Sequence, residues 1–170
     1  MFILGISGGF RLGNMDGAAC LIRDNLIIAA AEEERFVRVK HASGLIPLEA
    51  IKYCLKEANI KITDIDVLVF SGATYSGIED KLKRYFKFKL GCCPKLYFVE
   101  HHLAHAASAF FVSGFQNASI LTMDLSGDGV STLMAYGNGD KITKIKEFHR
   151  PNSLGAFYNL LTQYLGFNRN

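Results

Sequence analysis

One order of elements occurs twice in this 170-residue chain, and it restricts the possible folds more than any other feature. Residues 2–36 predict a strand, a glycine-rich turn, a two-stranded hairpin and then a helix. Residues 119–148 predict the same strand, turn and hairpin, and a second helix is expected to begin near Ser153. Few residues are identical between the copies, so the repeat is one of structure. The sequence therefore predicts a duplicated α/β unit.

The segment between the two copies completes the first of them. Apolar residues at helical spacing predict a helix that begins at Pro47 and ends near Asn59, and proline is well tolerated in a first helical turn. We further expect a buried strand, a basic helix, a short strand and a last helix, over residues 66–72, 77–90, 95–100 and 100–114. The predicted order is βββαβαβα.

Residues 1–116 thus form a predicted first half, and residues 117–170 begin a second half that stops after its first helix. Two such halves are typical of the actin-like (ribonuclease H-like) α/β fold, in which glycine turns direct backbone N–H groups towards phosphate in a cleft. The candidate turns are residues 8–17 and 125–129. Neither has a Walker or dinucleotide fingerprint, so each could also be an ordinary hairpin turn. On this interpretation the chain is the front of a longer protein.

Three of the five histidines lie within five positions of the helix expected over residues 100–114. His101 and His105 are one helical turn apart on one face, a spacing that lets two imidazoles bind one metal ion, whereas His102 points elsewhere. Asp124, at the end of a predicted strand, is the expected third ligand, and this donor set suits iron, manganese or zinc. No glutamate separates the pair, which excludes a zinc-peptidase motif. The alternative is that one histidine caps the helix and another packs in the core.

The composition of the chain mainly excludes certain partners, membrane segments and cysteine-based sites. A net charge of +3 indicates no polyanionic partner, and 49% apolar residues are enough for a core. No apolar run reaches membrane-spanning length and the N-terminus lacks signal-peptide features, so we expect a cytoplasmic protein with no membrane partner. The four cysteines lack zinc-site or disulfide-framework spacing and are expected to be reduced.

Five stretches, in this order, carry a family resemblance: ILGIS, IIAAAEEERFVRVKH, HHLAHAASAF, TMDLSGDGVST and NSLGAFYNLLTQYLGF. Together they resemble the front of the O-carbamoyltransferases of nodulation-factor and antibiotic pathways. The resemblance implies that His101, His105 and Asp124 bind the metal. It also implies two steps, in which ATP and carbamoyl phosphate give carbamoyl adenylate, whose carbamoyl group passes to a hydroxyl of a small, sugar-like acceptor.

Other residues are assigned partly through the same resemblance. Ser126, Gly127 and Gly129 are expected to approach phosphate with their backbone, and Asp128 either binds a second cation or solvates a turn.

Lys40 is the expected anion contact of the segment from Arg35 to His41, although that segment could instead be the solvated face of an edge strand. Met15 stands where the family usually has histidine, and the following Asp16 is retained as a candidate catalytic residue. Because a thioether can neither accept a proton nor donate a hydrogen bond, this departure puts turnover in question, and Arg11 or Asn14 could substitute.

Two other functions remain open. One is a nucleotide- or metal-binding module without catalysis, and the other is an enzyme of threonylcarbamoyl transfer to transfer RNA, which the lack of a broad basic field disfavours. Basic and aromatic residues alternate over residues 81–90, but an amphipathic helix explains them as well, so a nucleic-acid partner is not expected. The apolar face of the helix expected over residues 153–165 favours self-association, for example as a homodimer.

Overall fold

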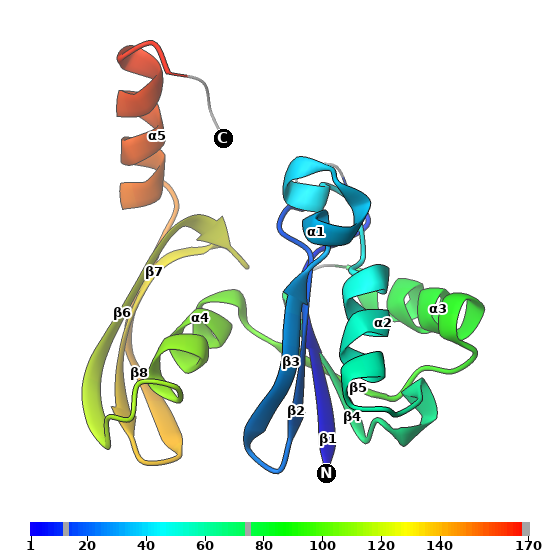
Figure 1. Cartoon of the computed structure of the whole chain (residues 1–170). Coiled ribbons are helices and arrows are strands. Elements are labelled where there is room, and N and C mark those ends of the chain that lie inside the picture. The colour runs from blue at the N-terminus through cyan, green and yellow to red at the C-terminus, as the bar shows by residue number, and fades with distance from the viewer. Residues whose placement is uncertain (12–13, 74–75, 168–170) are drawn as a thin grey trace. The chain divides into compact units, whose positions relative to one another are not determined.

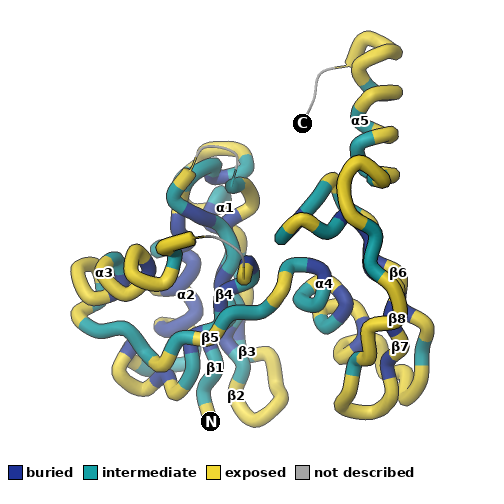
Figure 2. The backbone as a smooth tube through the Cα atoms, turned by 180° about the vertical axis from the view of Figure 1, so that it is seen from behind, coloured by how far each residue is buried: buried dark blue, intermediate teal, exposed yellow. Residues whose placement is uncertain are grey.

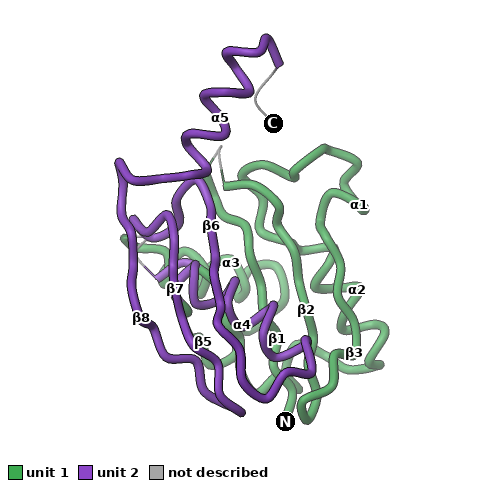
Figure 3. The backbone as a smooth tube through the Cα atoms, turned by 90° about the vertical axis from the view of Figure 1, so that its left-hand side faces the viewer, with its two compact units in different colours: residues 1–71, 75–99 green, residues 72–74, 100–170 purple. Residues whose placement is uncertain are grey.

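The computed structural model describes residues 1–11, 14–73 and 76–167, and the chain divides into two units. Unit 1 comprises residues 1–71 and 75–99, and unit 2 comprises residues 72–74 and 100–170 (Figure 3). Among the described residues, no helix has both the length and the apolar character needed to cross a membrane.

Unit 1 is built on a five-stranded sheet in the order β3-β2-β1-β4-β5 (Figure 1). The first three strands form an antiparallel meander, while β4 pairs parallel to β1, and β5 pairs parallel to β4. Their bounds are β1 Phe2–Ile6, β2 Ala18–Arg23, β3 Leu26–Glu32, β4 Val67–Ser71 and β5 Lys95–Val99. The three-strand meander and the two later strands occur in the order that was predicted for the first half, and the structure adds their pairing.

Two helices cover one face of this sheet: α2, Leu48–Glu57, and α3, Ile78–Leu90. Buried residues alternate with less buried ones along the central strands (Figure 2). The buried side chains share one core with apolar residues of both helices. That core includes Leu4, Leu21, Leu68, Phe70, Ile51, Cys54, Leu82 and Phe86. The short 3₁₀ helix η2, Ile62–Asp64, precedes β4.

The N-terminus of α2 is capped by a buried carboxylate that the sequence did not single out. Glu33 is 2% exposed, and its two oxygens accept hydrogen bonds from the backbone N–H groups of Glu49 and Ala50 at 3.1 and 2.8 Å. These bonds satisfy donors that a helix leaves unpaired in its first turn, and the negative charge lies at the favourable end of the helix dipole.

The segment between β3 and α2 is helical, so its interpretation as the face of an edge strand is wrong. It contains α1, Glu34–Val37, and the 3₁₀ helix η1, Lys40–Ala42. Three acidic residues followed by Arg35 are better helix formers than strand formers, and Arg38 ends α1 in the left-handed conformation.

Unit 2 has a three-stranded antiparallel sheet in the order β6-β7-β8, with bounds Asn117–Gly127, Val130–Asn138 and Lys141–His149. Helix α4, His101–Phe110, packs on β6 and β7, and α5, Leu154–Tyr164, follows β8. A small core joins α4 to the sheet through Ala106, Phe110, Ile120, Leu133 and Ala135.

The predicted repeat is therefore present as two meanders, β1-β2-β3 and β6-β7-β8, each followed by a helical segment. The boundary between the units differs from the one expected at 116/117, because α4 is grouped with the second sheet and the division falls at Val99/Glu100. The expected boundary follows the repeat of elements, whereas the observed division follows the packing of α4 on β6 and β7.

Candidate metal centre

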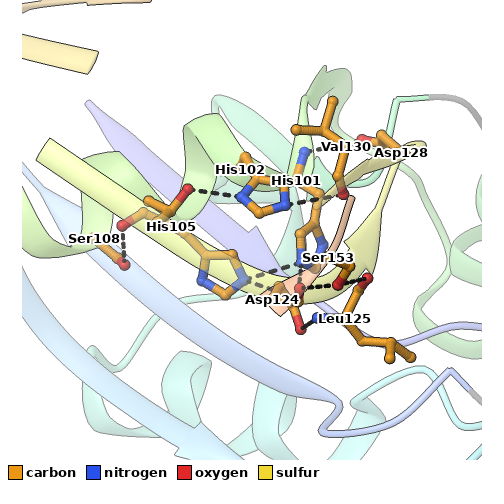
Figure 4. A network of polar contacts seen from close by, with 10 residues as sticks. His101, His102, His105, Ser108, Asp124, Leu125, Asp128, Val130 and Ser153 are labelled. Carbon is orange, nitrogen blue, oxygen red and sulfur yellow. Dashed lines mark hydrogen bonds and ion pairs between the residues drawn. The ribbon is translucent and has the colours of Figure 1, made fainter. Parts of the chain in front are cut away.

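The first two turns of α4 and the C-terminal part of β6 bring three predicted ligands together within unit 2 (Figure 4). The Nε2 atom of His101 lies 2.8 Å from Oδ2 of Asp124 and 3.0 Å from Nε2 of His105. The third side of this triangle, from His105 Nε2 to the same aspartate oxygen, is 3.7 Å. One helical turn separates the histidines, so both rings project towards the strand that carries the carboxylate.

These separations fit a single ion. The circle through the three ligand atoms has a radius of about 1.9 Å, which is slightly less than the usual metal–nitrogen and metal–oxygen bond of about 2.0–2.2 Å. One cation can therefore bond to all three atoms at once. Two imidazoles and one carboxylate, all partly exposed, form a donor set suited to zinc, iron or manganese, with further positions open to other ligands.

The surroundings favour the unprotonated forms that bind metal. Burial, with repulsion from His101, lowers the pKa of His105 below its ordinary value. Burial alone would raise the pKa of Asp124, but hydrogen bonds from His101 and from the N–H of Leu125 outweigh it, so this pKa is lowered. Because a metal competes with protons for its ligands, both shifts favour metal binding near neutral pH.

His102 has a structural role in unit 2. It is 3% exposed, with Nδ1 2.7 Å from the Thr122 hydroxyl and Nε2 3.1 Å from the carbonyl oxygen of Val130 (Figure 4). Burial lowers its pKa, so the neutral ring is favoured, and a neutral imidazole can donate to the carbonyl and accept from the hydroxyl. The expectation that one histidine of the three packs in the core therefore holds for His102 alone.

The lack of a side chain at Gly127 makes room for the ring of His101. A Cβ atom at this position would lie 2.1 Å from Cγ and Cδ2 of His101, far inside van der Waals contact. Only glycine allows the ring to pack against the end of β6. The expected role of Gly127 in approaching phosphate stays a prediction, but this packing role is sufficient to explain the glycine.

The neighbouring turn has a local structural explanation as well. Asp128 and Gly129, with φ of 51° and 82°, join β6 to β7 as a two-residue hairpin turn, for which Asp-Gly is a favoured pair. The Asp128 carboxylate accepts hydrogen bonds from the backbone N–H groups of His101 and Ala73, both at 2.9 Å, and so caps α4. Ser126 lies within β6, beside this turn. Phosphate contact by these residues stays a prediction.

Two residues at the start of α5 position the backbone of Asp124, a role that no sequence pattern indicated. The Ser153 hydroxyl donates to the carbonyl oxygens of Asp124 and Leu125 at 3.1 and 2.9 Å and accepts the N–H of Ala156 (Figure 4). A Cβ atom on Gly155 would lie 2.6 Å from the Asp124 carbonyl. The serine-glycine pair that opens α5 therefore fixes the strand position of the carboxylate ligand.

A cavity of about 220 Å³ adjoins this site inside unit 2. Its lining includes His101, His102, Gly127, Asp128, Glu100, Glu147 and His149. One of the three candidate ligands, His101, therefore lines a cavity that is rich in side chains able to form hydrogen bonds.

Asp16 and Lys40, the two candidate catalytic residues, both belong to unit 1. The Asp16 carboxylate lies 2.9 Å from Nδ1 of His41, and Lys40 is an exposed residue at the start of η1. Residues 12–13 of the first glycine turn lie outside the described residues. Met15, in the expected histidine position, is 44% exposed.

Comparison with known proteins shows to which family the chain belongs. The sequence profile of the carbamoyltransferase N-terminus family matches residues 3–91 and 78–170. The chain belongs to that family. The nodulation protein NolNO of Sinorhizobium fredii is 36% identical to this carbamoyltransferase-family chain across 98% of the chain and 29% of NolNO. An uncharacterized Synechocystis protein is 36% identical over 99% of the chain and 32% of its own length. The chain thus spans about a third of these curated relatives.

Solved structures confirm the fold predicted for this carbamoyltransferase-family chain. Component A of the Acidaminococcus fermentans (R)-2-hydroxyglutaryl-CoA dehydratase aligns with 99% of the chain and 55% of its own, at a TM-score of 0.55 and 14% identity. YeaZ from Pseudomonas aeruginosa aligns with 86% of the chain and 65% of its own, at 0.52 and 12%. The chain has the actin-like α/β fold, and at these identities the likeness shows the fold alone.

Proposed function

We propose that this chain is the N-terminal portion of an ATP- and metal-dependent carbamoyltransferase that carbamoylates a hydroxyl group of a small acceptor. The convergence of His101, His105 and Asp124 in a chain of the carbamoyltransferase N-terminus family carries the proposal. The donors come from adjacent elements of one unit, and capping by Asp128 and packing on Gly127 hold His101 in place.

In the proposed reaction, water cleaves carbamoyl phosphate to carbamate and inorganic phosphate, and a carbamate oxygen attacks the α-phosphorus of ATP and displaces pyrophosphate, which gives carbamoyl adenylate. The acceptor hydroxyl then attacks the carbonyl carbon of carbamoyl adenylate. A bond forms between the acceptor oxygen and that carbon, the bond to the adenylate oxygen breaks, AMP leaves with the electron pair, and the proton of the hydroxyl passes to solvent. Such an attack places negative charge on the carbonyl oxygen. A divalent ion, iron, zinc or manganese, supplies Lewis-acid stabilisation of developing negative charge when bound.

The chain's own residues have separate tasks in this proposal. His101, His105 and Asp124 hold the ion, while the backbone of residues 126–129 approaches phosphate oxygens. Lys40 provides a positive charge for an anionic group, consistent with its exposure at the start of η1. Asp16 is the second candidate catalytic residue in unit 1.

Metal analysis of purified protein tests the centre. We expect His101→Ala and His105→Ala each to lose one bound ion per chain relative to the unmodified protein, measured by mass spectrometry of the metals after gel filtration. His149→Ala is the matched control, because this histidine lies in the same unit with its ring near the Gly129 carbonyl and outside the cluster. Equal metal content in all four proteins would refute the centre.

The affinity of the chain for ATP tests the second part of the proposal, which is the nucleotide site. We expect calorimetry to show only weak, millimolar ATP binding to this chain, because the remaining two thirds of the relatives' length would complete a nucleotide site. Micromolar affinity with undiminished binding in Lys40→Ala would contradict the division of tasks, and would favour the alternative of a self-sufficient nucleotide-binding module.

A further inference from the structure

We infer that unit 1 contains a second binding site for a divalent transition-metal ion, formed by Asp16, Glu34 and His41. The three residues lie on the first glycine turn, helix α1 and η1, and each offers one ligand atom, all within 4.8 Å of one another. The site lies wholly within unit 1 and shares no residue with the His101–His105–Asp124 centre.

The mixed donor set distinguishes this cluster from an ordinary group of surface carboxylates. Oδ1 of Asp16 lies 2.9 Å from Nδ1 of His41. Two ligands that bond to one ion at about 2.1 Å and at right angles are about 3.0 Å apart, so the observed pair already has the separation of neighbouring ligands. Glu34 adds a second carboxylate, and its side chain is 26% exposed, compared with 30% for His41 and 68% for Asp16.

Backbone hydrogen bonds fix these ligands relative to one another. The N–H of Asp16 donates to the carbonyl of His41 at 2.7 Å, and the N–H of His41 donates to Oε2 of Glu34 at 2.8 Å. The Ser7 hydroxyl also donates to the carbonyl of Asp16 at 3.0 Å. These hydrogen bonds hold the three metal-ligand residues in place before an ion binds, which reduces the conformational entropy lost on binding.

Two of the proposed ligands, Asp16 and His41, have a left-handed backbone conformation, which residues other than glycine rarely adopt. Asp16 and His41 have φ of 56° and 64°, and Ala42, next to His41, has φ of 41°. Left-handed residues other than glycine are strained, and they persist where the surroundings require them. Here they direct the Asp16 and His41 side chains to one point, where an ion would link the glycine turn to η1.

One imidazole with two carboxylates suits Mn²⁺ or Zn²⁺ better than the oxygen-only sites of Mg²⁺ and Ca²⁺. The exposure of Asp16 leaves room for water to complete the coordination. A carboxylate oxygen that holds an ion is not available as a proton acceptor. On this assignment Asp16 is a metal ligand, and its contribution is to order the turn that carries it.

Metal stoichiometry in the full chain tests the second site separately from the first. Protein stripped with chelator is reloaded with Zn²⁺ or Mn²⁺ and analysed after gel filtration. We expect two ions per chain in the unmodified protein, one in the double variant His101→Ala/His105→Ala, and one in His41→Gln or Asp16→Asn. Combining the two sets of changes should remove both ions.

Glu49→Gln is the matched control, because this carboxylate is in unit 1 but pairs with Lys52 at 2.7 Å instead of joining the cluster. It should leave two ions bound. Because His101→Ala/His105→Ala could fail to fold, circular dichroism is recorded for every protein. The single variants His41→Gln and Asp16→Asn test the second site without those two histidine changes. Two ions that remain in both His41→Gln and Asp16→Asn, or a single ion that is lost in His101→Ala/His105→Ala but kept in His41→Gln and Asp16→Asn, would refute the second site. A single ion that is kept in His101→Ala/His105→Ala but lost in His41→Gln and Asp16→Asn would refute the first centre and leave the second standing.

Discussion

Substitution of Gly127 by alanine is the sharpest test of how the candidate centre is built. The added methyl group would lie 2.1 Å from two ring carbons of His101, whereas carbon atoms in contact stay about 3.5–4.0 Å apart. The ring must therefore retreat by roughly 1.4 Å or more. Its Nε2 atom now lies 2.8 Å from Asp124 and 3.0 Å from His105, so such a shift separates it from both. We expect Gly127→Ala to lose the ion of unit 2.

The same clash has a predictable cost in stability. Overpacking of this kind destabilises a protein by about 1–3 kcal/mol, and the backbone of Gly127 lies outside the left-handed region, so no strain from alanine itself is expected. Urea unfolding of the chelator-treated protein measures this cost without the contribution of bound metal. Gly129→Ala is the control, because nothing lies within 4 Å of its Cβ position although its φ is +82°: it should lower stability but leave metal binding intact.

A double-mutant cycle identifies the clashing partner. Once His101→Ala has removed the ring, Gly127→Ala should have almost no cost, so the two changes should be non-additive by about 1–3 kcal/mol. The double variant should still bind no ion in unit 2. Additive effects, or a Gly127→Ala protein that keeps its metal, would refute the packing of His101 on Gly127.

Three further predictions concern buried groups. His102→Ala should lower the free energy of unfolding by about 1–3 kcal/mol, because Thr122 loses its partner, while the ion of unit 2 is retained; loss of the ion with an intact fold would contradict this assignment. Glu33→Gln should destabilise unit 1 by a similar amount, roughly 1–3 kcal/mol in urea unfolding, because it weakens the cap of α2, and an unchanged midpoint would argue against the cap. Burial raises the pKa of Cys54 to about 11, so a thiol reagent at pH 8 should modify it only after unfolding; rapid reaction in the native protein would show that it is accessible.

The parts of the site that sequence could predict are those fixed by local periodicity. Helical spacing places His101 and His105 on one face and turns His102 away, whatever the helix packs against. The repeat of elements places Asp124 on the first strand of the second meander, and the structure brings it to the histidine pair. Each of these inferences needs only the geometry of one element and the order of elements along the chain.

The parts that sequence could not predict depend on close approaches between distant residues. Glycine in a hairpin is ordinarily explained by the turn, so Gly127 gave no sign that it makes room for His101. The meeting of Asp16 with His41 depends on left-handed backbone at both positions, a conformation that aspartate and histidine adopt more often than most residues but still too rarely to be predicted. The helical segment after β3 was obscured because residues 37–40 alternate apolar and basic side chains, as a half-buried strand does.

The placement of the metal ligands couples the candidate centre of unit 2 to the stability of that unit. The helix that carries His101 and His105 also inserts His102, Ala106 and Phe110 into contact with the sheet, and Asp128 caps it. A change that shifts α4 relative to the sheet therefore displaces both imidazoles. Conversely, an ion that binds only the folded arrangement stabilises it by an amount that rises with the logarithm of free metal concentration. Metal titration should thus raise the unfolding midpoint of unit 2 in the unmodified protein, and it should have no such effect once His105 is replaced.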